Sequence, residues 1–320
     1  MLVDATAYLA PYPPRQVRRP VRLRLTEHTY PLEGPPEHSW LPIAFRAFAR
    51  LAQGIPIRDL LIVGSGNGLD ALGAVEIFDL ASLAVTDLRA ESVAVIRDNV
   101  LSHLEGQAEL GLGFYAGDLL ACVPTTARFD LVYENLPNLP ATPDVALELG
   151  SHSGRFYEPT DRGVPEPFDA YLLALHYRCL RQARGHVRPG GGVLTAIGGR
   201  MPHEVAFDLH RACGYAPELV AYDVKLQAEP ALVLPGYRRA EEQQGVEFTF
   251  YAAEAVMVVA DARRSGLEGQ SLAAAVAGQL GRLAISAREA QERSRRGEPV
   301  AHSVLMLFGR RPPDTRGSTA

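Results

Sequence analysis

The chain has 320 residues, of which 47% are hydrophobic and 22% are charged, and these proportions are ordinary for a folded soluble protein. The formal net charge of -5 argues against general affinity for nucleic acid, which requires a basic face. The sequence has no apolar run long enough to cross a bilayer, and its three cysteines form no CxxC pair. We therefore predict a cytoplasmic protein that binds no metal ion, no nucleic acid and no membrane.

The first fifty residues contain two predicted elements. Alternating apolar and polar residues over 21–33 predict a short hairpin, and helical periodicity over 39–53 predicts a helix with Ser39 as its N-cap. We interpret residues 1–54 as an N-terminal cap, in which Tyr8 and Tyr12 are candidates to close over a bound ligand.

From residue 58 onward, strands alternate with helices. The predicted strands cover residues 59–66, 82–87, 111–118, 129–137, 191–199, 218–227 and 302–310, and the first and the fourth each run into a turn. The predicted helices between them cover residues 69–80, 91–104, 168–184 and 203–214. This alternation predicts a doubly wound α/β fold, in which a seven-stranded, largely parallel sheet carries helices on both faces.

The stretch before the last strand departs from this order. Residues 228–299 hold an apolar segment at 246–259 and a long predicted helix at 272–295, so we predict an insertion within a domain that spans residues 55–311. The inserted helix either packs within the chain or forms a homodimer. Residues 312–320 are predicted to be a disordered tail.

A glycine-rich turn, VGSGNG at residues 63–68, follows the first strand of the alternating region. Glycines in this position permit a tight turn and let a ligand approach the backbone amides at a helix N-terminus. The dinucleotide fingerprint G-x-G-x-x-G would require glycine at Leu69. The glycines are instead Gly64, Gly66 and Gly68, which counts against a nicotinamide dehydrogenase.

The G-x-G-x-G spacing resembles that of the class I S-adenosylmethionine (SAM) methyltransferases, over residues 58–227 and the last strand. Asp87 ends the second strand, where the resemblance implies hydrogen bonds to both ribose hydroxyls. Asp118 ends the third, where it implies a contact with the adenine amino group. The alternative is that both are polar strand ends of the kind found in any α/β protein. The resemblance implies a SAM site formed by Gly64, Ser65, Gly66, Gly68, Asp87, Leu88, Gly117, Asp118, Leu119 and Asn135.

The turn after the fourth strand carries a partial match to a second motif. Class I enzymes that methylate amide or amino nitrogens often have [DNS]-P-P-[YFW] here, and residues 135–138 read Asn-Leu-Pro-Asn. The resemblance implies that Asn135 orients a nitrogen, whereas the missing aromatic argues against a straightforward glutamine or adenine methyltransferase. Asn135 could instead cap a turn. Glu134 is a candidate to accept a proton or hold an amine, or it is a loop charge that faces solvent.

Residues 141–167 form a long connection of the kind that often serves as a lid. Within and beside it, Asn138 and Tyr157 are candidate substrate contacts and His152 is a candidate general base. Tyr171, in the first turns of the next predicted helix, is either a core residue or an aromatic contact in the active site.

Three functions fit these features. The first is a SAM-dependent methyltransferase that acts on a nitrogen of a small molecule. The second resembles the azetidine-2-carboxylate synthases, in which the amine of SAM attacks its own γ-carbon and expels methylthioadenosine. In that case SAM alone is the substrate, with Asn135 near the amine and Tyr171 near the sulfonium. The third is a non-catalytic SAM-binding protein.

Overall fold

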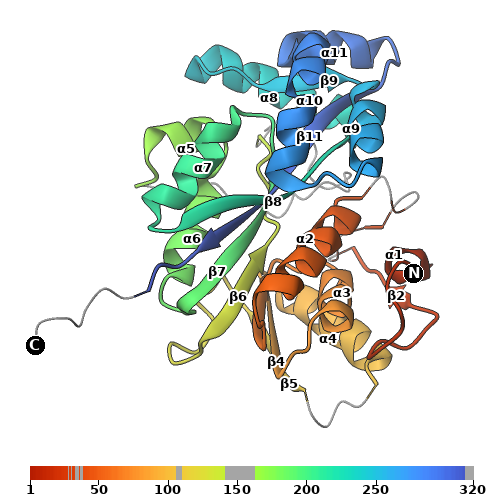
Figure 1. Ribbon diagram of the computed structural model, residues 1–320, viewed down its shortest axis with the longest axis vertical. Helices are drawn as coiled ribbons and strands as arrows, with labels where there is room; N and C mark the ends of the chain where they lie inside the picture. The colour runs from red at the N-terminus through yellow and green to blue at the C-terminus, as the bar shows by residue number, and fades with distance from the viewer. Residues whose placement is uncertain are drawn as a thin grey trace, which may run out of the picture.

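The computed structural model describes residues 1–27, 29, 31–32, 36, 39–105, 110–140 and 163–313. Within these residues, a sheet of nine strands forms the centre of the molecule and helices pack on both of its faces (Figure 1). No helix in these ranges is both long enough and apolar enough to span a membrane.

The strand order confirms the predicted doubly wound sheet. Seven strands lie in the order β5-β4-β3-β6-β7-β11-β8. The first five pair in parallel, while β11 runs antiparallel to both β7 and β8. This order, with its single antiparallel strand, is that of the Rossmann-like methyltransferase fold. The bounds are β3 (Asp59–Val63), β4 (Ser82–Asp87), β5 (Gly111–Ala116), β6 (Phe129–Glu134), β7 (Val187–Gly198), β8 (Ala216–Leu226) and β11 (Val300–Arg310).

Alternation along the strands supplies a hydrophobic core on each face. In β3, Leu60 and Ile62 belong to one core, whereas Leu61 and Val63 belong to the other. Because successive side chains of a strand point to opposite faces, a strand that is buried on both sides must be apolar throughout. The first core includes α2 (Leu41–Gly54), α3 (Leu69–Ile77) and α4 (Ala90–His103), and the second includes α5 (Glu166–Ala170), α6 (Ala174–Ala183) and α7 (His203–Ala212).

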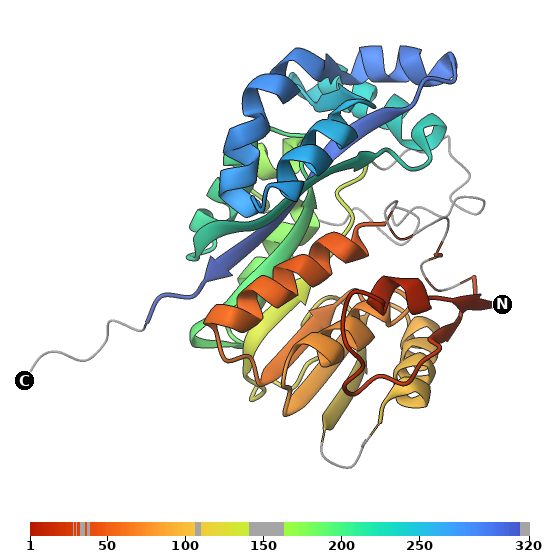
Figure 2. The same cartoon turned by 45° about the vertical axis from the view of Figure 1, so that its right-hand side comes forward.

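The N-terminal segment folds differently from the prediction. Among the described residues of 21–33, the expected hairpin does not form, because β2 (Arg22–Arg24) pairs with β1 (Leu2–Asp4) across the short helix α1 (Thr6–Leu9). The buried carboxylate of Glu76 accepts the backbone N–H groups of residues 15, 16 and 17, which ties this segment to α3. Helix α2 packs against α3, β8 and β11 and so completes a helical layer (Figure 2).

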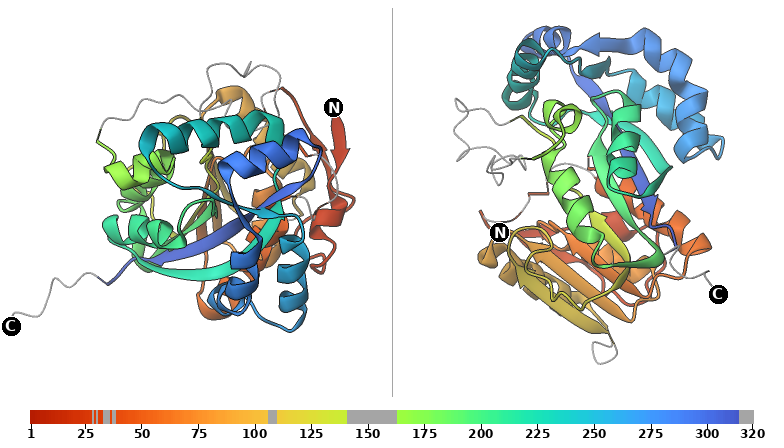
Figure 3. Two further views of the ribbon diagram at one scale, coloured as in Figure 1. Left: turned by 90° about the horizontal axis from the view of Figure 1, so that it is seen from above. Right: turned by 90° about the vertical axis from the view of Figure 1, so that its left-hand side faces the viewer.

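The predicted insertion lies between β8 and β11 and gathers at one end of the molecule (Figure 3). Its elements are α8 (Pro230–Gln244), β9 (Thr249–Ala252), α9 (Ala255–Arg264), α10 (Gly269–Leu283), β10 (Ala284–Ser286) and α11 (Ala287–Arg295). The single helix expected over 272–295 is wrong, since β10 pairs with β9 and buries Ile285. The Ser286 hydroxyl then accepts the N–H of Glu289 and starts a new helix.

The helix expected over residues 168–184 is also interrupted. Leu172 adopts a φ of 62°, which ends the short helix α5, and Leu173 beyond it is fully buried. A left-handed residue cannot continue a right-handed helix. The chain therefore changes direction before α6 begins.

Candidate active site

The strand registers bring the ends of three strands to one level at the carboxyl edge of the sheet. Val63 pairs with Thr86 of β4 and with Glu134 of β6. The residues that follow these three in the chain are Gly64, Asp87 and Asn135. After β3 the chain passes to helices on one face and after β6 to helices on the other, so this edge is a topological switch point, where open α/β sheets bind ligands.

A cavity of about 600 Å³ occupies this edge. Its wall includes the glycine turn, the ends of β4 and β5, the turn after β6, and parts of β7, β8 and β11. The volume falls within the range of small-molecule sites, which is about 300–1,000 Å³. One cavity therefore joins the two motifs that the sequence singled out.

Three glycines of the turn have positive φ values, and two of them, Gly64 and Gly66, line the cavity. Gly64 and Gly66 have φ values of 74° and 67°, in the left-handed region that side chains rarely adopt. A Cβ atom on Gly64 would also lie 3.2 Å from Cδ2 of Leu136. The glycine turn and the turn after β6 are therefore packed directly against one another.

Asp87 faces the glycine turn across the cavity edge. Its Oδ2 accepts the Gly66 N–H at 3.2 Å, and burial raises the pKa of the carboxyl above its ordinary value while that N–H opposes the rise. Behind the turn, the Ser65 hydroxyl donates to Asp70, whose pKa is raised to about 7, mainly by burial. Two carboxylates thus lie close to the turn, and one of them lines the cavity.

Gly117, Asp118 and Leu119 line the cavity beside Leu88, at the end of β5. The carboxylate of Asp118 is half exposed and pairs with Arg178 of α6. The leucines offer apolar surface for a flat ring, and Asp118 supplies an acceptor at its margin. This end fits an adenine ring.

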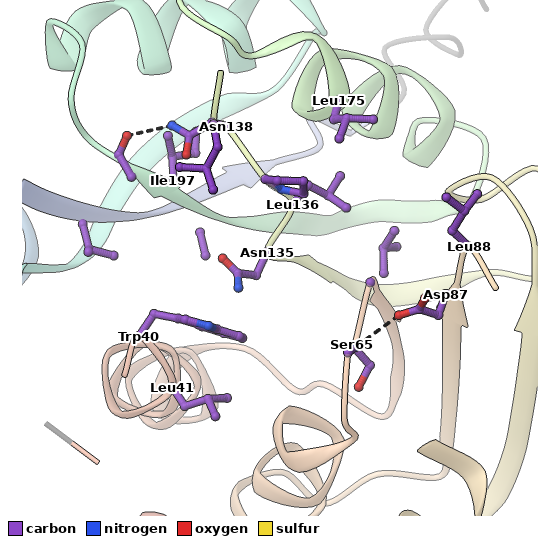
Figure 4. Close-up of a pocket in the computed structure, with 18 of the residues that line it drawn as sticks. Trp40, Leu41, Ser65, Asp87, Leu88, Asn135, Leu136, Asn138, Leu175 and Ile197 are labelled. Atoms are coloured by element: carbon purple, nitrogen blue, oxygen red, sulfur yellow. Dashed lines mark hydrogen bonds between the residues drawn. The ribbon is translucent and has the colours of Figure 1, made fainter. Parts of the chain in front are cut away.

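Asn135 lies near the middle of the cavity (Figure 4). Its side-chain amide makes no hydrogen bond within the described part of the chain, so it is available to a ligand. The indole ring of Trp40, at the start of α2, lies across the cavity from it (Figure 4). Further along, Asn138 donates from Nδ2 to the Gly198 carbonyl at 2.8 Å.

Glu134 was predicted to act on a substrate or to face solvent, and the structure gives it a different position. The side chain is fully buried behind the turn and does not line the cavity. Nδ1 of the equally buried His176 lies 2.8 and 2.9 Å from its two carboxylate oxygens, and Oε2 also accepts the Leu136 N–H at 3.1 Å. Glu134 therefore holds the turn that carries Asn135.

Three predicted aromatic contacts do not line the cavity. Tyr171 packs edge-on against Phe248, because the left-handed residue after it turns the chain away before α6. Tyr8 is buried in the first core, and Tyr12 packs edge-on against Phe45. His152 and Tyr157 lie outside the described residues.

Sequence reasoning missed the end of the cavity beyond Asn138. Arg200, Lys225, Gln227 and His302 line it, although none belongs to a recognised motif. One signal was present, since Lys225 is the only lysine in a chain that is rich in arginine.

The comparisons with known proteins point to methyltransferases. No protein-family model matches the chain. The release factor glutamine methyltransferase of Deinococcus radiodurans is 28% identical over 210 residues, which cover 62% of this chain and 64% of that protein. The match therefore spans less than two thirds of the relative.

Solved structures with a similar arrangement have low sequence identity. The YcgJ protein of Bacillus subtilis has a TM-score of 0.45 and 10% identity over 84% of this chain and 98% of that one. A putative methyltransferase from Bacillus halodurans has a TM-score of 0.42 and 12% identity, and the match likewise covers 84% of this chain and 98% of that one. Both scores lie below 0.5.

Proposed function

We propose that this protein is a SAM-dependent enzyme that transfers the methyl group of SAM to a nitrogen of a small-molecule acceptor. The observation that carries the proposal is one cavity of about 600 Å³, in which Asp87 and the glycine turn lie at one side and Asn135 lies near the middle. The side-chain amide of Asn135 makes no hydrogen bond to any described residue. The name of the Deinococcus relative, a glutamine methyltransferase, supports transfer to nitrogen.

The residues of the cavity fit SAM by their donors and acceptors. The N–H groups of the glycine turn and the carboxylate of Asp87 would hold the methionyl and ribose parts, and Leu88, Leu119 and Asp118 would surround the adenine. When bound, SAM supplies a methyl group on a sulfonium, whose carbon–sulfur bond breaks with both electrons passing to sulfur.

Asn135 would act by positioning the acceptor. Its side-chain oxygen accepts an N–H of the acceptor and so directs the nitrogen lone pair into the cavity, where the new nitrogen–carbon bond forms. The nitrogen then releases its proton to solvent. Positioning of this kind supplies much of the rate enhancement when the leaving group is already activated. Glu134 contributes indirectly, because it fixes the turn on which Asn135 lies.

The test is incubation of the purified protein with methyl-deuterated SAM and a mixture of small amines and amino acids, followed by mass spectrometry. The proposal predicts S-adenosylhomocysteine and a product that carries the labelled methyl group, both dependent on the mixture. If SAM alone yields methylthioadenosine and azetidine-2-carboxylate in equal amounts, the SAM cyclase replaces the methyltransferase. Bound SAM that is never consumed with any acceptor would indicate a non-catalytic protein.

A further inference from the structure

A cluster of basic side chains lines the cavity beyond Asn138. Lys225 of β8 and His302 of β11 are directly opposed in the antiparallel register, so their side chains lie on the same face. Arg200 joins them from the segment after β7. A Cβ atom on Gly198 would lie 2.2 Å from Nη1 of Arg200, so the guanidinium occupies the space that a side chain there would fill.

Asn138 connects this basic cluster to the turn that carries Asn135. The same Cβ position on Gly198 lies 3.1 Å from Oδ1 of Asn138, next to the guanidinium of Arg200. The Tyr237 hydroxyl donates to the Asn138 carbonyl at 2.8 Å, and Arg200 lies over the ring of that tyrosine at 5.2 Å. The cluster therefore adjoins the position proposed for the acceptor.

Among the described residues, the partners of Arg200 are neutral. Its side chain is buried, with 4% exposure, and Nε and Nη2 both donate to Oε1 of Gln227, at 3.0 and 2.8 Å. Several other arginines packed into the fold meet carboxylates. For example, Arg19 pairs with Glu76, and Arg46 pairs with both Asp223 and Glu268. A buried guanidinium without a carboxylate is costly, since buried charges are normally paired.

Lys225 adds a second positive charge at this end of the cavity, whereas His302 adds none. Burial and the nearby Arg200 lower the pKa of Lys225 to about 8. Burial, Arg200 and Lys225 hold the pKa of His302 well below its ordinary value, so the imidazole is neutral. Glu229 also lines this end of the cavity, yet among the described residues no carboxylate forms an ion pair with Arg200 or Lys225. Within the part of the chain that the structure describes, the two cations therefore have no ion-pair partner.

We propose that Arg200 and Lys225 form an anion subsite, and that the acceptor is a small amine that also carries a negatively charged oxygen group, either a carboxylate or a phosphate. The assignment to an acceptor rests on the proposed function. It also rests on position, because Asn138 and Asp87 lie on opposite sides of Asn135 (Figure 4). The carboxylate of SAM itself would lie nearer the glycine turn. Within the described residues, neither Arg200 nor Lys225 contacts a carboxylate, so Nη1 of Arg200 and the ammonium of Lys225 are the donors that we assign to the anion.

The single lysine gives a direct test in the intact protein. Wild-type protein is treated with a limiting amount of acetic anhydride at pH 8, in sodium chloride, 4-aminobutyrate or phosphate at equal ionic strength. Acetylation of Lys225 is followed by peptide mass spectrometry, with the N-terminal amine as the internal control. An opposite charge that raises the ammonium pKa of Lys225 by about one unit, from about 8, slows its acetylation at pH 8 by about fivefold.

The subsite predicts that 4-aminobutyrate or phosphate protects Lys225 and leaves the N-terminal amine unchanged, and that butylamine gives no protection. Protection by one anion and not the other identifies the oxygen group. Protection is lost in Arg200→Gln and restored in Arg200→Lys, while the surface variant Arg211→Gln behaves as wild type. Equal acetylation of Lys225 in all salts, with the N-terminal amine as reference, would overturn the proposal.

Two further measurements distinguish a failure of this inference from a failure of the proposed function. If S-adenosylhomocysteine protects Lys225 and methylthioadenosine, which lacks the carboxylate, does not, the cluster holds the carboxylate of the cofactor and the acceptor assignment fails. If small anions protect Lys225 but calorimetry detects no binding of S-adenosylhomocysteine, the anion subsite stands and the proposed function fails.

Discussion

Replacement of Glu134 by glutamine separates a structural role of this carboxylate from a catalytic one. The carboxylate meets two buried donors, Nδ1 of His176 at 2.8 and 2.9 Å and the Leu136 N–H at 3.1 Å. A glutamine carbonyl can accept one of these donors, and its amide group then faces the other. Leaving one buried donor unpaired costs about 1–3 kcal/mol.

This cost predicts a measurable loss of stability. A loss of about 1 kcal/mol in unfolding free energy lowers the melting temperature by about 2–4 °C in chains of about 150–250 residues, and by less in longer ones. We therefore expect the melting temperature of Glu134→Gln to fall by several degrees. Because the side chain lies behind the turn, the affinity for S-adenosylhomocysteine should stay within a few-fold of wild type, and turnover should fall only as far as the turn of Asn135 loosens.

The assay is differential scanning calorimetry of the variant together with its pH–rate profile. The control is Glu218→Gln, which changes an exposed glutamate and should leave both measurements unchanged. A general base would give the opposite result, with an unchanged melting temperature and a loss of turnover of about 10²–10⁴-fold. That outcome would refute the structural role.

The remaining predictions concern the cavity and the turn beside it. Asp87→Asn should weaken the binding of S-adenosylhomocysteine, measured by calorimetry, about 10- to 100-fold, since hydrogen bonds to a charged group contribute about 1.5–3 kcal/mol. The control Asp98→Asn changes an exposed residue and should bind S-adenosylhomocysteine as wild type does. Asn135→Ala should lower kcat about 100-fold in the labelled-methyl assay with little change in cofactor affinity, and unchanged turnover would contradict its positioning role. The pKa of Asp70 is raised to about 7 in the folded protein, so its contribution to stability is full below about pH 4 and is lost as the pH rises towards 7. The variant Asp70→Asn lacks this titration. Its free energy of unfolding in urea, relative to that of wild type, should therefore rise by up to about 4 kcal/mol between about pH 4 and pH 7. A difference that stays constant over this pH range would show that the raised pKa is wrong.

Most of the sheet and the glycine turn that lines the cavity could be predicted from the sequence, because those features depend on local patterns. A buried parallel strand such as residues 59–63 is apolar throughout, and a turn with left-handed φ values demands glycine at residues 64 and 66. These signals lie within a few consecutive residues. They can be recognised before any tertiary contact is known.

The features that the sequence did not reveal depend on contacts between distant segments. Glu134 looked like a loop charge until the fold placed His176, 42 residues away, against it. The basic end of the cavity combines Arg200, Lys225 and His302 from three separate segments, and no spacing rule links them. Tyr171 was a candidate for either the core or the active site, and the left-handed Leu172, which interrupts the expected helix, leaves it packed against Phe248.

The central claim is that the cavity at the switch point is a SAM site. Its most direct test is a calorimetric titration of the purified wild-type protein with S-adenosylhomocysteine, the product of methyl transfer. The account predicts saturable binding of one molecule per chain, weakened in Asp87→Asn. The absence of any binding heat at high ligand concentration, with the protein shown to be folded, would contradict it.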